Sequence, residues 1–296
     1  MDTVAVLASL GSVARRKQLL ALGLTDRDLM AAVAAGTVSR PHRGCFALPD
    51  ATWSSVRARV LSAQLTCLSA LHALELPNIQ AYSGLHLAIP AHRGFASGDR
   101  RLREGMRFHR VEGAQDLRVL APVATVLDHL GLCAKPLTQL AAVDAALHSE
   151  RLTLEDIAHF TATSLRRRVW LAAHAEPLTQ SPRETKARLE LKSTGLSVVP
   201  QAEIPGLGHA DFLVASAIVV ECDGFTYHGD EAAFLEDRRR DRVCEMLGLG
   251  RLRYTGDEVA ASQGRIANDV RQLLAARSRL SRVVGEDVTR GTSLGR

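Results

Sequence analysis

The sequence predicts an α+β protein with mixed α/β domains, in which sheets are flanked by helices. Apolar residues recur at helical spacing in some segments and alternate with polar residues in others, and the two kinds of segment are interleaved along the chain. The 296 residues, 46% hydrophobic and 23% charged, are typical of globular proteins and sufficient for two or three domains. We place these domains at 1–50, 51–178 and 181–280, followed by a flexible tail at 281–296.

The first domain begins with the pattern of three short helices. We expect them at 4–10, 14–22 and 25–35. Thr25 can cap the third helix, because its hydroxyl can accept a backbone N–H of the first turn. Gly36 can end that helix, because glycine readily takes the left-handed conformation found after helices.

A hairpin follows the three helices, and the combination is typical of a winged helix-turn-helix. Two extended runs within residues 37–48 meet at a turn around 41–44. In this arrangement the third helix reads base edges and the basic residues of the hairpin hold phosphates. The candidate DNA contacts are Arg15, Arg16, Lys17, Thr25, Arg27, Arg40 and Arg43. The alternative is a small helical module that packs on its neighbour and binds no nucleic acid.

The distribution of charge favours a polyanionic partner for this first segment. The whole chain has a net charge of +5, and residues 1–60 hold eight Lys and Arg against four Asp and Glu. Most of the positive excess therefore lies where DNA would bind.

The same segment resembles a known family of DNA-binding domains. Residues 19–48 are similar to the N-terminal domain of AbiEi-type antitoxins, on the basis of Gly23, Leu29, Gly36, Arg40, Gly44 and Phe46. Because that family uses the domain as a winged helix on DNA, the resemblance implies DNA as a partner. Residues 51–178 resemble the segment that follows it in AbiEi-like chains.

The middle domain shows little sign of chemistry. We expect a long helix at 51–75, strands at 84–90 and 106–111, and two or three helices within 137–175. The five cysteines of the chain are scattered without a C-x-x-C pair, and the histidines of this domain lack the spacing of metal-binding motifs. We therefore expect neither disulfides nor a thiolate zinc site, and we expect the histidines at the surface or satisfied in the core.

No segment has the pattern of a signal peptide or a membrane span. The apolar stretches are interrupted by charged residues, and the first residues lack a basic segment followed by an apolar one. The odd number of scattered cysteines favours a reducing compartment. We expect a cytoplasmic protein without membrane contact.

From residue 181 the pattern becomes helix, three strands, helix, strand and helix. Ser181 can cap the first helix, with Pro182 at its first position and Glu184 at its third. The later strands and helices are expected at 196–204, 209–214, 217–221, 234–247, 252–254 and 267–280.

Three acidic residues converge in this predicted sheet. Asp211 lies near the end of one strand, and Glu221 and Asp223 lie at the end of the next. Antiparallel strands joined by a short turn bring Asp211 and Glu221 close enough to share one ion. Buried carboxylates need a compensating cation, and Mg²⁺ or Mn²⁺ suits carboxylate ligands, so we expect a divalent metal site. The alternatives are that Asp211 caps a turn, that Asp223 belongs to a turn and that Glu184 serves only in a capping box.

The motifs around these acids resemble a nuclease family. Residues 221–228 read E-C-D-G-F-T-Y-H and residues 237–241 read D-R-R-R-D. Residues 181–275 are therefore similar to the very-short-patch-repair-endonuclease-like domain of the PD-(D/E)xK nuclease superfamily. The resemblance implies a restriction-endonuclease-like mixed sheet flanked by helices.

The resemblance also implies roles for the acidic residues. Asp211 and Glu221 would be catalytic metal ligands, and Cys222 would lend its backbone carbonyl to the same metal. Asp223 is also a catalytic candidate. It stands where the superfamily usually has a lysine, and an acid cannot supply the positive charge of that lysine.

The remaining site residues follow from the same resemblance. His228 is assigned to proton transfer or phosphate contact, and Glu184 is a further catalytic candidate. Arg238 and Arg240 could hold phosphates, or they could form a charged helix face instead.

The leading hypothesis for function is a metal-dependent DNA endonuclease with an N-terminal DNA-binding module. The alternative is a non-catalytic DNA-binding regulator or antitoxin of a toxin–antitoxin or phage-defence system. A zinc site made of His209, Cys222, His228 and Cys244 is disfavoured, because Cys222 alternates away from its acidic neighbours. The sequence does not identify a protein partner.

Overall fold

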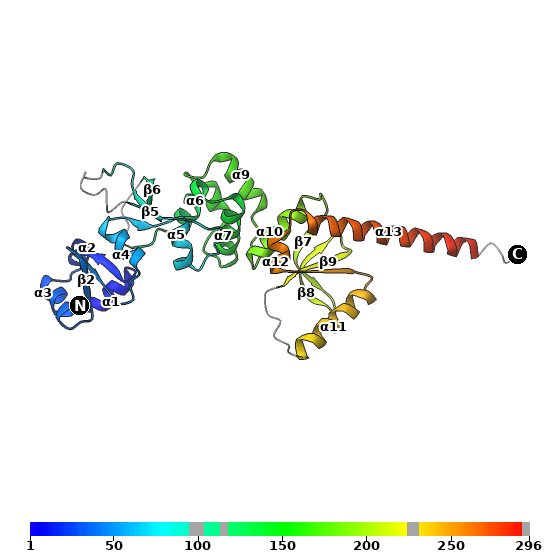
Figure 1. The fold of residues 1–296 in the computed structure, drawn as a ribbon, viewed down its shortest axis with the longest axis horizontal. Helices are drawn as coiled ribbons and strands as arrows, with labels where there is room; N and C mark the ends of the chain where they lie inside the picture. Colours follow the sequence, from blue (N-terminus) through cyan, green and yellow to red (C-terminus); the bar gives the residue numbers. More distant parts are fainter. Residues whose placement is uncertain (95–103, 113–117, 224–230, 292–296) are drawn as a thin grey trace. The chain divides into compact units, whose positions relative to one another are not determined.

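The computed structural model divides the chain into two compact units, Met1–Ala175 (unit 1) and Glu176–Arg296 (unit 2) (Figure 1). It describes residues 1–94, 104–112, 118–223 and 231–291. Helices alternate with mixed and antiparallel sheets, which confirms the predicted α+β class. In the part of the chain that the structure describes, no helix combines the length and the apolar character needed to cross a bilayer.

Unit 1 begins with three helices and a small sheet. Its elements are α1 (Thr3–Ser9), β1 (Val13–Arg15), α2 (Arg16–Ala21), α3 (Asp26–Ala34), β2 (Ser39–His42) and β3 (Cys45–Ala47). The sheet has the order β1-β3-β2, with both pairings antiparallel. Leu7, Leu19, Leu29 and Phe46 form a shared core, which holds the helices against the hairpin. The predicted helices and hairpin are present, and β1 is an addition that the sequence did not reveal.

The predicted long helix at 51–75 is wrong. This region contains α4 (Trp53–Val60), β4 (Gln64–Leu65), α5 (Leu68–Leu71) and a 3₁₀ turn at His72–Leu74. Ser62 and Cys67 have backbone φ angles of 49° and 53°. A right-handed helix cannot pass through such left-handed residues, so the chain turns at each of them.

A second sheet and four helices complete unit 1. The expected strands are β5 (Leu85–Pro90) and β6 (Met106–Val111), in the order β4-β5-β6. β4 is antiparallel to β5, whereas β5 and β6 are parallel. The helices are α6 (Val123–Cys133), α7 (Pro136–His148), α8 (Leu154–Ala158) and α9 (Leu165–His174). The division of residues 137–175 into helical pieces agrees with the expectation.

Unit 2 follows the predicted order of elements with two differences. It contains α10 (Pro182–Lys192), β7 (Val198–Ile204), β8 (Gly208–Val214), β9 (Ile218–Asp223), α11 (Glu231–Met246), β10 (Gly250–Thr255), α12 (Gly256–Ala261) and α13 (Arg265–Gly291). The short helix α12 was not expected. α13 continues to Gly291, whereas the sequence analysis placed a flexible tail from residue 281.

The sheet of unit 2 lies between two layers of helices (Figure 1). Its order is β10-β9-β8-β7, and only the β9–β10 pairing is parallel. Residues such as Phe212 and Val220 pack with α10, α12 and α13 on one face. Val219 packs with Cys244 of α11 on the other face. This three-layer arrangement places the end of β9 beside α11, which carries the arginine-rich motif.

Candidate functional site

A row of polar residues crosses the four strands of unit 2. Arg253 on β10 is paired with Glu221 on β9. Extending the β8–β9 register by one residue places Asp211 opposite Glu221. The β7–β8 register places Gln201 opposite Asp211. We call these four residues the polar row. The expectation that Asp211 and Glu221 lie on neighbouring strands is met by this register.

Asp211 is tied to the strand that carries Glu221. Its Oδ2 atom accepts a hydrogen bond of 2.7 Å from the backbone N–H of Cys222. A carboxylate that accepts a backbone N–H is held in one orientation, because the hydrogen bond is directional. Asp211 is therefore fixed next to the acidic end of β9.

The negative charge of Glu221 is balanced by two arginines, so its burial does not require a metal ion. Its Oε1 forms an ion pair with Arg240 of α11, and its Oε2 accepts from Nε of Arg251 at 2.7 Å. The side chains of Glu221, Arg240 and Arg251 are 10%, 16% and 8% exposed. The sequence predicts that a divalent cation compensates this buried carboxylate. Guanidinium groups already supply positive charge beside it, and metal binding stays a prediction.

Arg251 connects Glu221 to further acids on α11. Its guanidinium lies 2.6 Å from a carboxylate oxygen of Asp241 and 3.6 Å from one of Asp237. Arg253 lies 2.5 Å from Asp237, and this hydrogen bond lowers the pKa of the Asp237 carboxyl. We call the group formed by Glu221, Asp237, Asp241, Arg240, Arg251 and Arg253 the arginine–carboxylate network.

Arg251 contacts three acids of this network, and no role for it was predicted from the sequence. The available signal was the alternation of residues 250–255, which places two arginines on one face of a half-buried strand. A buried arginine needs carboxylate partners, so this alternation predicts acids on the facing helix.

Glu184 is buried and joins α10 to the polar row. Its Oε2 accepts hydrogen bonds of 3.0 Å from the backbone N–H of Gln180 and from Nε2 of Gln201. Ser181 caps α10 by accepting from the backbone N–H of Glu184. The predicted capping box is therefore not completed, because the Glu184 carboxylate accepts from the backbone N–H of Gln180 rather than from that of Ser181. A catalytic role for it stays a prediction.

The structure describes only the backbone of Asp223 and does not describe His228, two of the predicted catalytic residues. Asp223 is the last residue of β9 and is paired with Thr255 of β10. His228 belongs to residues 224–230, which lie outside the described residues.

The cysteines of the disfavoured zinc alternative are separated by the sheet of unit 2. Cys222 and Cys244 belong to the cores on opposite faces. Two side chains on opposite faces of a sheet do not converge on one ion. This separation agrees with the rejection of that alternative.

Arg240 is directed into unit 2 rather than along the helix surface. Besides its ion pair with Glu221, its guanidinium donates to the backbone carbonyls of Leu207 and His209, each at 2.9 Å. Arg238 has a side chain that is 61% exposed, and its guanidinium lies 5.1 Å from the ring centre of Phe234. The two arginines of the predicted phosphate contact therefore differ in environment.

Two of the predicted DNA contacts of unit 1 are engaged in internal contacts. Arg15 donates to the carbonyl of Val60 at 3.1 Å and to the hydroxyl of Ser62 at 2.5 Å. Arg16 forms an ion pair with Asp26. The structure thus gives Arg15 an internal role, which the sequence did not suggest.

Thr25 caps α3 through its side chain. Its Oγ1 accepts from the backbone N–H of Asp28 and donates to the Asp28 carboxylate at 2.7 Å. The predicted cap is therefore confirmed, and the hydroxyl of this candidate DNA contact is engaged within the helix. The other predicted basic contacts of unit 1 are exposed, namely Lys17, Arg27, Arg40 and Arg43.

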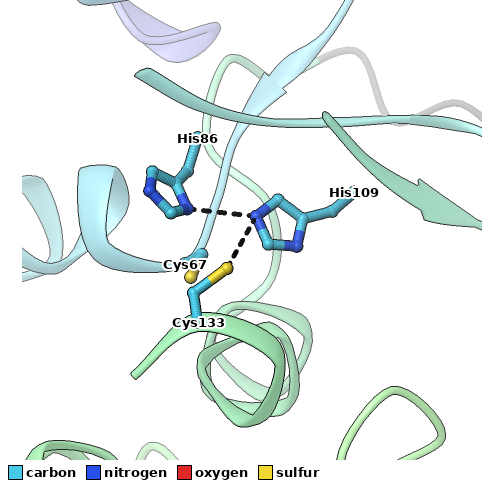
Figure 2. Close-up of side chains that lie close together, drawn as sticks. All are labelled: Cys67, His86, His109 and Cys133. Atoms are coloured by element: carbon cyan, nitrogen blue, oxygen red, sulfur yellow. Dashed lines mark hydrogen bonds between the residues drawn. The ribbon is translucent and has the colours of Figure 1, made fainter. Parts of the chain in front are cut away.

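Unit 1 also contains a buried group of cysteines and histidines (Figure 2). The group consists of Cys67 before α5, His86 on β5, His109 on β6 and Cys133 at the end of α6. One ligand atom from each residue lies within 4.8 Å of those of the other three. Within the described parts of the chain, no other set of three or more His, Cys, Asp and Glu gathers in this way.

The expectation of histidines satisfied in the core is met by His86 and His109, which are buried and joined by a hydrogen bond, but their gathering with two cysteines was not predicted. The four residues come from four elements far apart in the sequence, so no local motif marks them. The available signal was His86, a histidine inside the apolar strand 85–90. A polar ring at such a position needs a partner in the core.

Comparisons with known proteins do not assign the chain to a family. No family model matches the sequence, and no curated protein matches it. Among solved structures, the chain is similar to the crystal structure of RV2827C protein from Mycobacterium tuberculosis, at a TM-score of 0.31 and 14% sequence identity. The match covers 64% of this chain and 79% of that chain.

Proposed function

We propose that unit 2 is a metal-dependent phosphodiesterase that cleaves DNA, and that unit 1 supplies DNA binding. The observation that carries the proposal is the placement of Asp211 on β8 next to the segment of β9 that carries Glu221, with its carboxylate accepting the backbone N–H of Cys222. Glu184 is a further catalytic candidate, and its carboxylate is hydrogen-bonded to Gln201 of the polar row. Two carboxylates on neighbouring strands are a suitable basis for metal-dependent phosphoryl chemistry.

The donor set suits a hard divalent cation. Asp211 and Glu221 would hold Mg²⁺ or Mn²⁺ through carboxylate oxygens, and the Cys222 carbonyl is the third predicted ligand. Such a cation, when bound, supplies Lewis-acid stabilisation of the phosphate and lowers the pKa of water. The structure does not describe the side chain of Asp223, so the proposed ligands are the two carboxylates and the Cys222 carbonyl.

Arginines of α11 and β10 would position Glu221 and contact the substrate. Arg251 binds Oε2 of Glu221 and is itself held by Asp241, so it keeps the carboxylate oriented. Arg240 binds the other oxygen from α11. A guanidinium forms strong, bidentate hydrogen bonds with phosphate, and the exposed Arg238 of the same helix is the better placed of the two predicted phosphate contacts.

The DNA-binding role of unit 1 is supported by its arrangement and its exposed charges. The order α1, β1, α2, α3, β2, β3 is the order expected of a winged helix, with α3 as the recognition helix. Lys17, Arg27, Arg40 and Arg43 are exposed and would contact phosphates.

The decisive experiment measures cleavage of plasmid and oligonucleotide DNA, with RNA as a comparison, in Mg²⁺, Mn²⁺ or EDTA. The informative variant is Asp211→Asn, because an Asn carbonyl can still accept the Cys222 N–H while the negative charge is lost. The matched control is Glu203→Gln, an exposed carboxylate of β7 outside the polar row.

The proposal expects metal-dependent cleavage by the wild type and the control. It expects Asp211→Asn to be folded and at least about 100-fold slower, since removing a key charge at an active site typically costs this much. Cleavage that persists in EDTA, or that survives in Asp211→Asn, would rule the proposal out.

The second candidate function is a non-catalytic DNA-binding regulator. The observation that favours it is the arginine–carboxylate network, which satisfies Glu221 without any metal ion. On this hypothesis the acids of β9 stabilise a scaffold. Salt-sensitive DNA binding by a wild-type protein that cleaves no nucleic acid in Mg²⁺ or Mn²⁺ would select this candidate over the nuclease.

A further inference from the structure

The cysteine–histidine group of unit 1, defined as Cys67, His86, His109 and Cys133, lies between a sheet and two helices. In the parallel register His109 is paired with Ala88, so His86 and His109 lie on one face of the sheet, offset by two residues. Cys67 precedes α5, and Cys133 is the last residue of α6. Figure 2 shows the four side chains pointing toward one another.

The distances within the group already approach those of a tetrahedral site. Nδ1 of His86 lies 3.1 Å from Nε2 of His109, and Sγ of Cys133 lies 3.8 Å from the same Nε2. In a tetrahedral zinc site with two nitrogen and two sulfur ligands, neighbouring ligand atoms lie roughly 3.3 to 3.8 Å apart. Little movement is needed to bring all four atoms onto one ion.

Both histidines are held in the uncharged form that binds metals. His86 is 2% exposed and His109 is 3% exposed. Burial, assisted by the charge of Arg107, lowers the pKa of His86 to about 4. Burial, assisted by His129, His86 and Arg107, lowers the pKa of His109 to about 3. A neutral imidazole keeps a lone pair for a cation, and no protonated ring repels it.

The chain around Cys67 is fixed in place before any ion arrives. The backbone N–H of Thr66 donates to the carbonyl of His86, and the backbone N–H of His86 donates to the hydroxyl of Ser69. These bonds join the segment around Cys67 to the strand that carries His86. Cys67 itself has a φ of 53°, a left-handed conformation that is uncommon for a residue with a side chain.

We propose that Cys67, His86, His109 and Cys133 bind one Zn²⁺ ion as a structural site. Two thiolates and two imidazoles are the ligands that zinc takes in closed, four-coordinate sites, whereas Mg²⁺ and Ca²⁺ prefer oxygen. Four protein ligands leave no position for a substrate, so the site stabilises the fold. This zinc site is independent of the acidic centre proposed for unit 2.

Zinc binding deprotonates both thiols and releases two protons to solvent. In the absence of metal, burial raises the pKa of the Cys67 thiol, with a contribution from Cys133. The Cys67 thiol then donates to the carbonyl of His129 at 3.4 Å. On binding, this weak hydrogen bond is exchanged for a metal–sulfur bond.

The test uses the full-length chain, purified under reducing conditions. The zinc content per chain is measured by inductively coupled plasma mass spectrometry. Co²⁺ is then added to the chelator-treated protein, because tetrahedral cobalt with thiolate ligands has intense visible absorption. The variant is Cys133→Ala, at the least buried ligand. The matched control is Cys45→Ala, which removes a buried cysteine of β3 outside the group.

We expect about one zinc per wild-type chain and a tetrahedral thiolate spectrum with cobalt. Cys133→Ala should weaken cobalt binding by more than about 100-fold, because even the loss of a group that supports a ligand costs 10- to 100-fold. The control should bind as the wild type does. If Cys133→Ala fails to fold, the cobalt spectrum of the wild type decides by itself.

Three results would overturn the zinc site. The first is a reduced wild-type chain that holds no zinc and gives no tetrahedral cobalt spectrum. The second is a Cys133→Ala variant that binds metal as tightly as the control. The third is a disulfide between Cys67 and Cys133 in place of a metal, detected by mass and by thiol counting.

Discussion

The Glu221 carboxylate sets the balance of charge inside unit 2, because Arg240 and Arg251 both depend on it. Glu221→Gln should lower the free energy of unfolding by about 3 kcal/mol, at the lower end of the range for breaking a buried ion pair. The loss stays at that end because Arg251 keeps Asp241 as a partner. Urea unfolding measures the change, with the exposed Glu203→Gln as control. An unchanged midpoint would show that the network contributes no stability.

A second prediction at the residue scale concerns Asp237. Its pKa is lowered in the folded protein by hydrogen bonding to Arg253, with further contributions from the charges of Arg253 and Arg251. Its stabilising effect is therefore complete above the unfolded pKa of about 4 and is lost as the pH falls through the lower folded value.

Unfolding of the wild type and of Asp237→Asn should be compared between neutral and acid pH. The wild type should be more stable at pH 7, and the difference should shrink below about pH 4. The two proteins differ at this one carboxyl group, so the difference in their unfolding free energies isolates Asp237. A difference that is constant over this range would contradict the assigned ion pair.

At the scale of elements, the α3 and hairpin region carries the DNA-binding proposal. Arg40 and Arg43 are exposed, and neither sits in an internal ion pair in the way that Arg16 does. Replacing both by Gln should reduce the slope of log affinity against log salt by about 2, since each phosphate contact contributes about 0.9.

Fluorescence anisotropy with duplex DNA over a range of salt measures this slope. The matched control is Arg271→Gln, which removes an exposed arginine of α13 in unit 2. If Arg271→Gln lowered the slope as much as the double replacement of Arg40 and Arg43 does, the hairpin would have no specific role in DNA binding.

Helices and strands could be predicted from the sequence wherever their own residues mark where they begin and end. α10 was predictable because Ser181, Pro182 and Glu184 mark its start, and the strands that carry Asp211 and Glu221 are short apolar runs separated by a turn. The break in residues 51–75 was not predictable, because the apolar spacing there is helical. The turns arise from left-handed backbone at Ser62 and Cys67, and neither residue is a glycine that would signal it.

The candidate sites could be predicted only where their residues are close in the sequence. Asp211 and Glu221 are separated by one short turn, so their proximity follows from strand geometry alone. The partners of Glu221 on α11 and β10, and the gathering of Cys67 with Cys133, depend on tertiary packing between distant segments. No local pattern contains that information.

For the whole molecule, the two compact units predict two unfolding transitions. Each unit has its own buried core, so each should unfold cooperatively. A strong zinc chelator should lower the midpoint of the unit 1 transition alone, because ligands that bind only the folded form stabilise it. Glu221→Gln should lower that of unit 2 alone.

Scanning calorimetry of the full chain records both transitions. The assignment is made with a fragment spanning residues 176–296, which should reproduce the unit 2 transition and be insensitive to the chelator. One transition that responds to both perturbations would contradict the independence of the units.

The parallel pairing of β9 with β10 constrains the order of events during folding. The two strands cannot pair through a tight turn, so α11 must form and dock before or while β10 adds to the sheet. The antiparallel strands β7, β8 and β9 need only short loops and can form earlier. Until β10 arrives, Glu221 lacks the Arg251 guanidinium and remains hydrated. Glu221→Gln should therefore speed unfolding while leaving the refolding rate nearly unchanged, and the acidic centre is among the last parts of unit 2 to be completed.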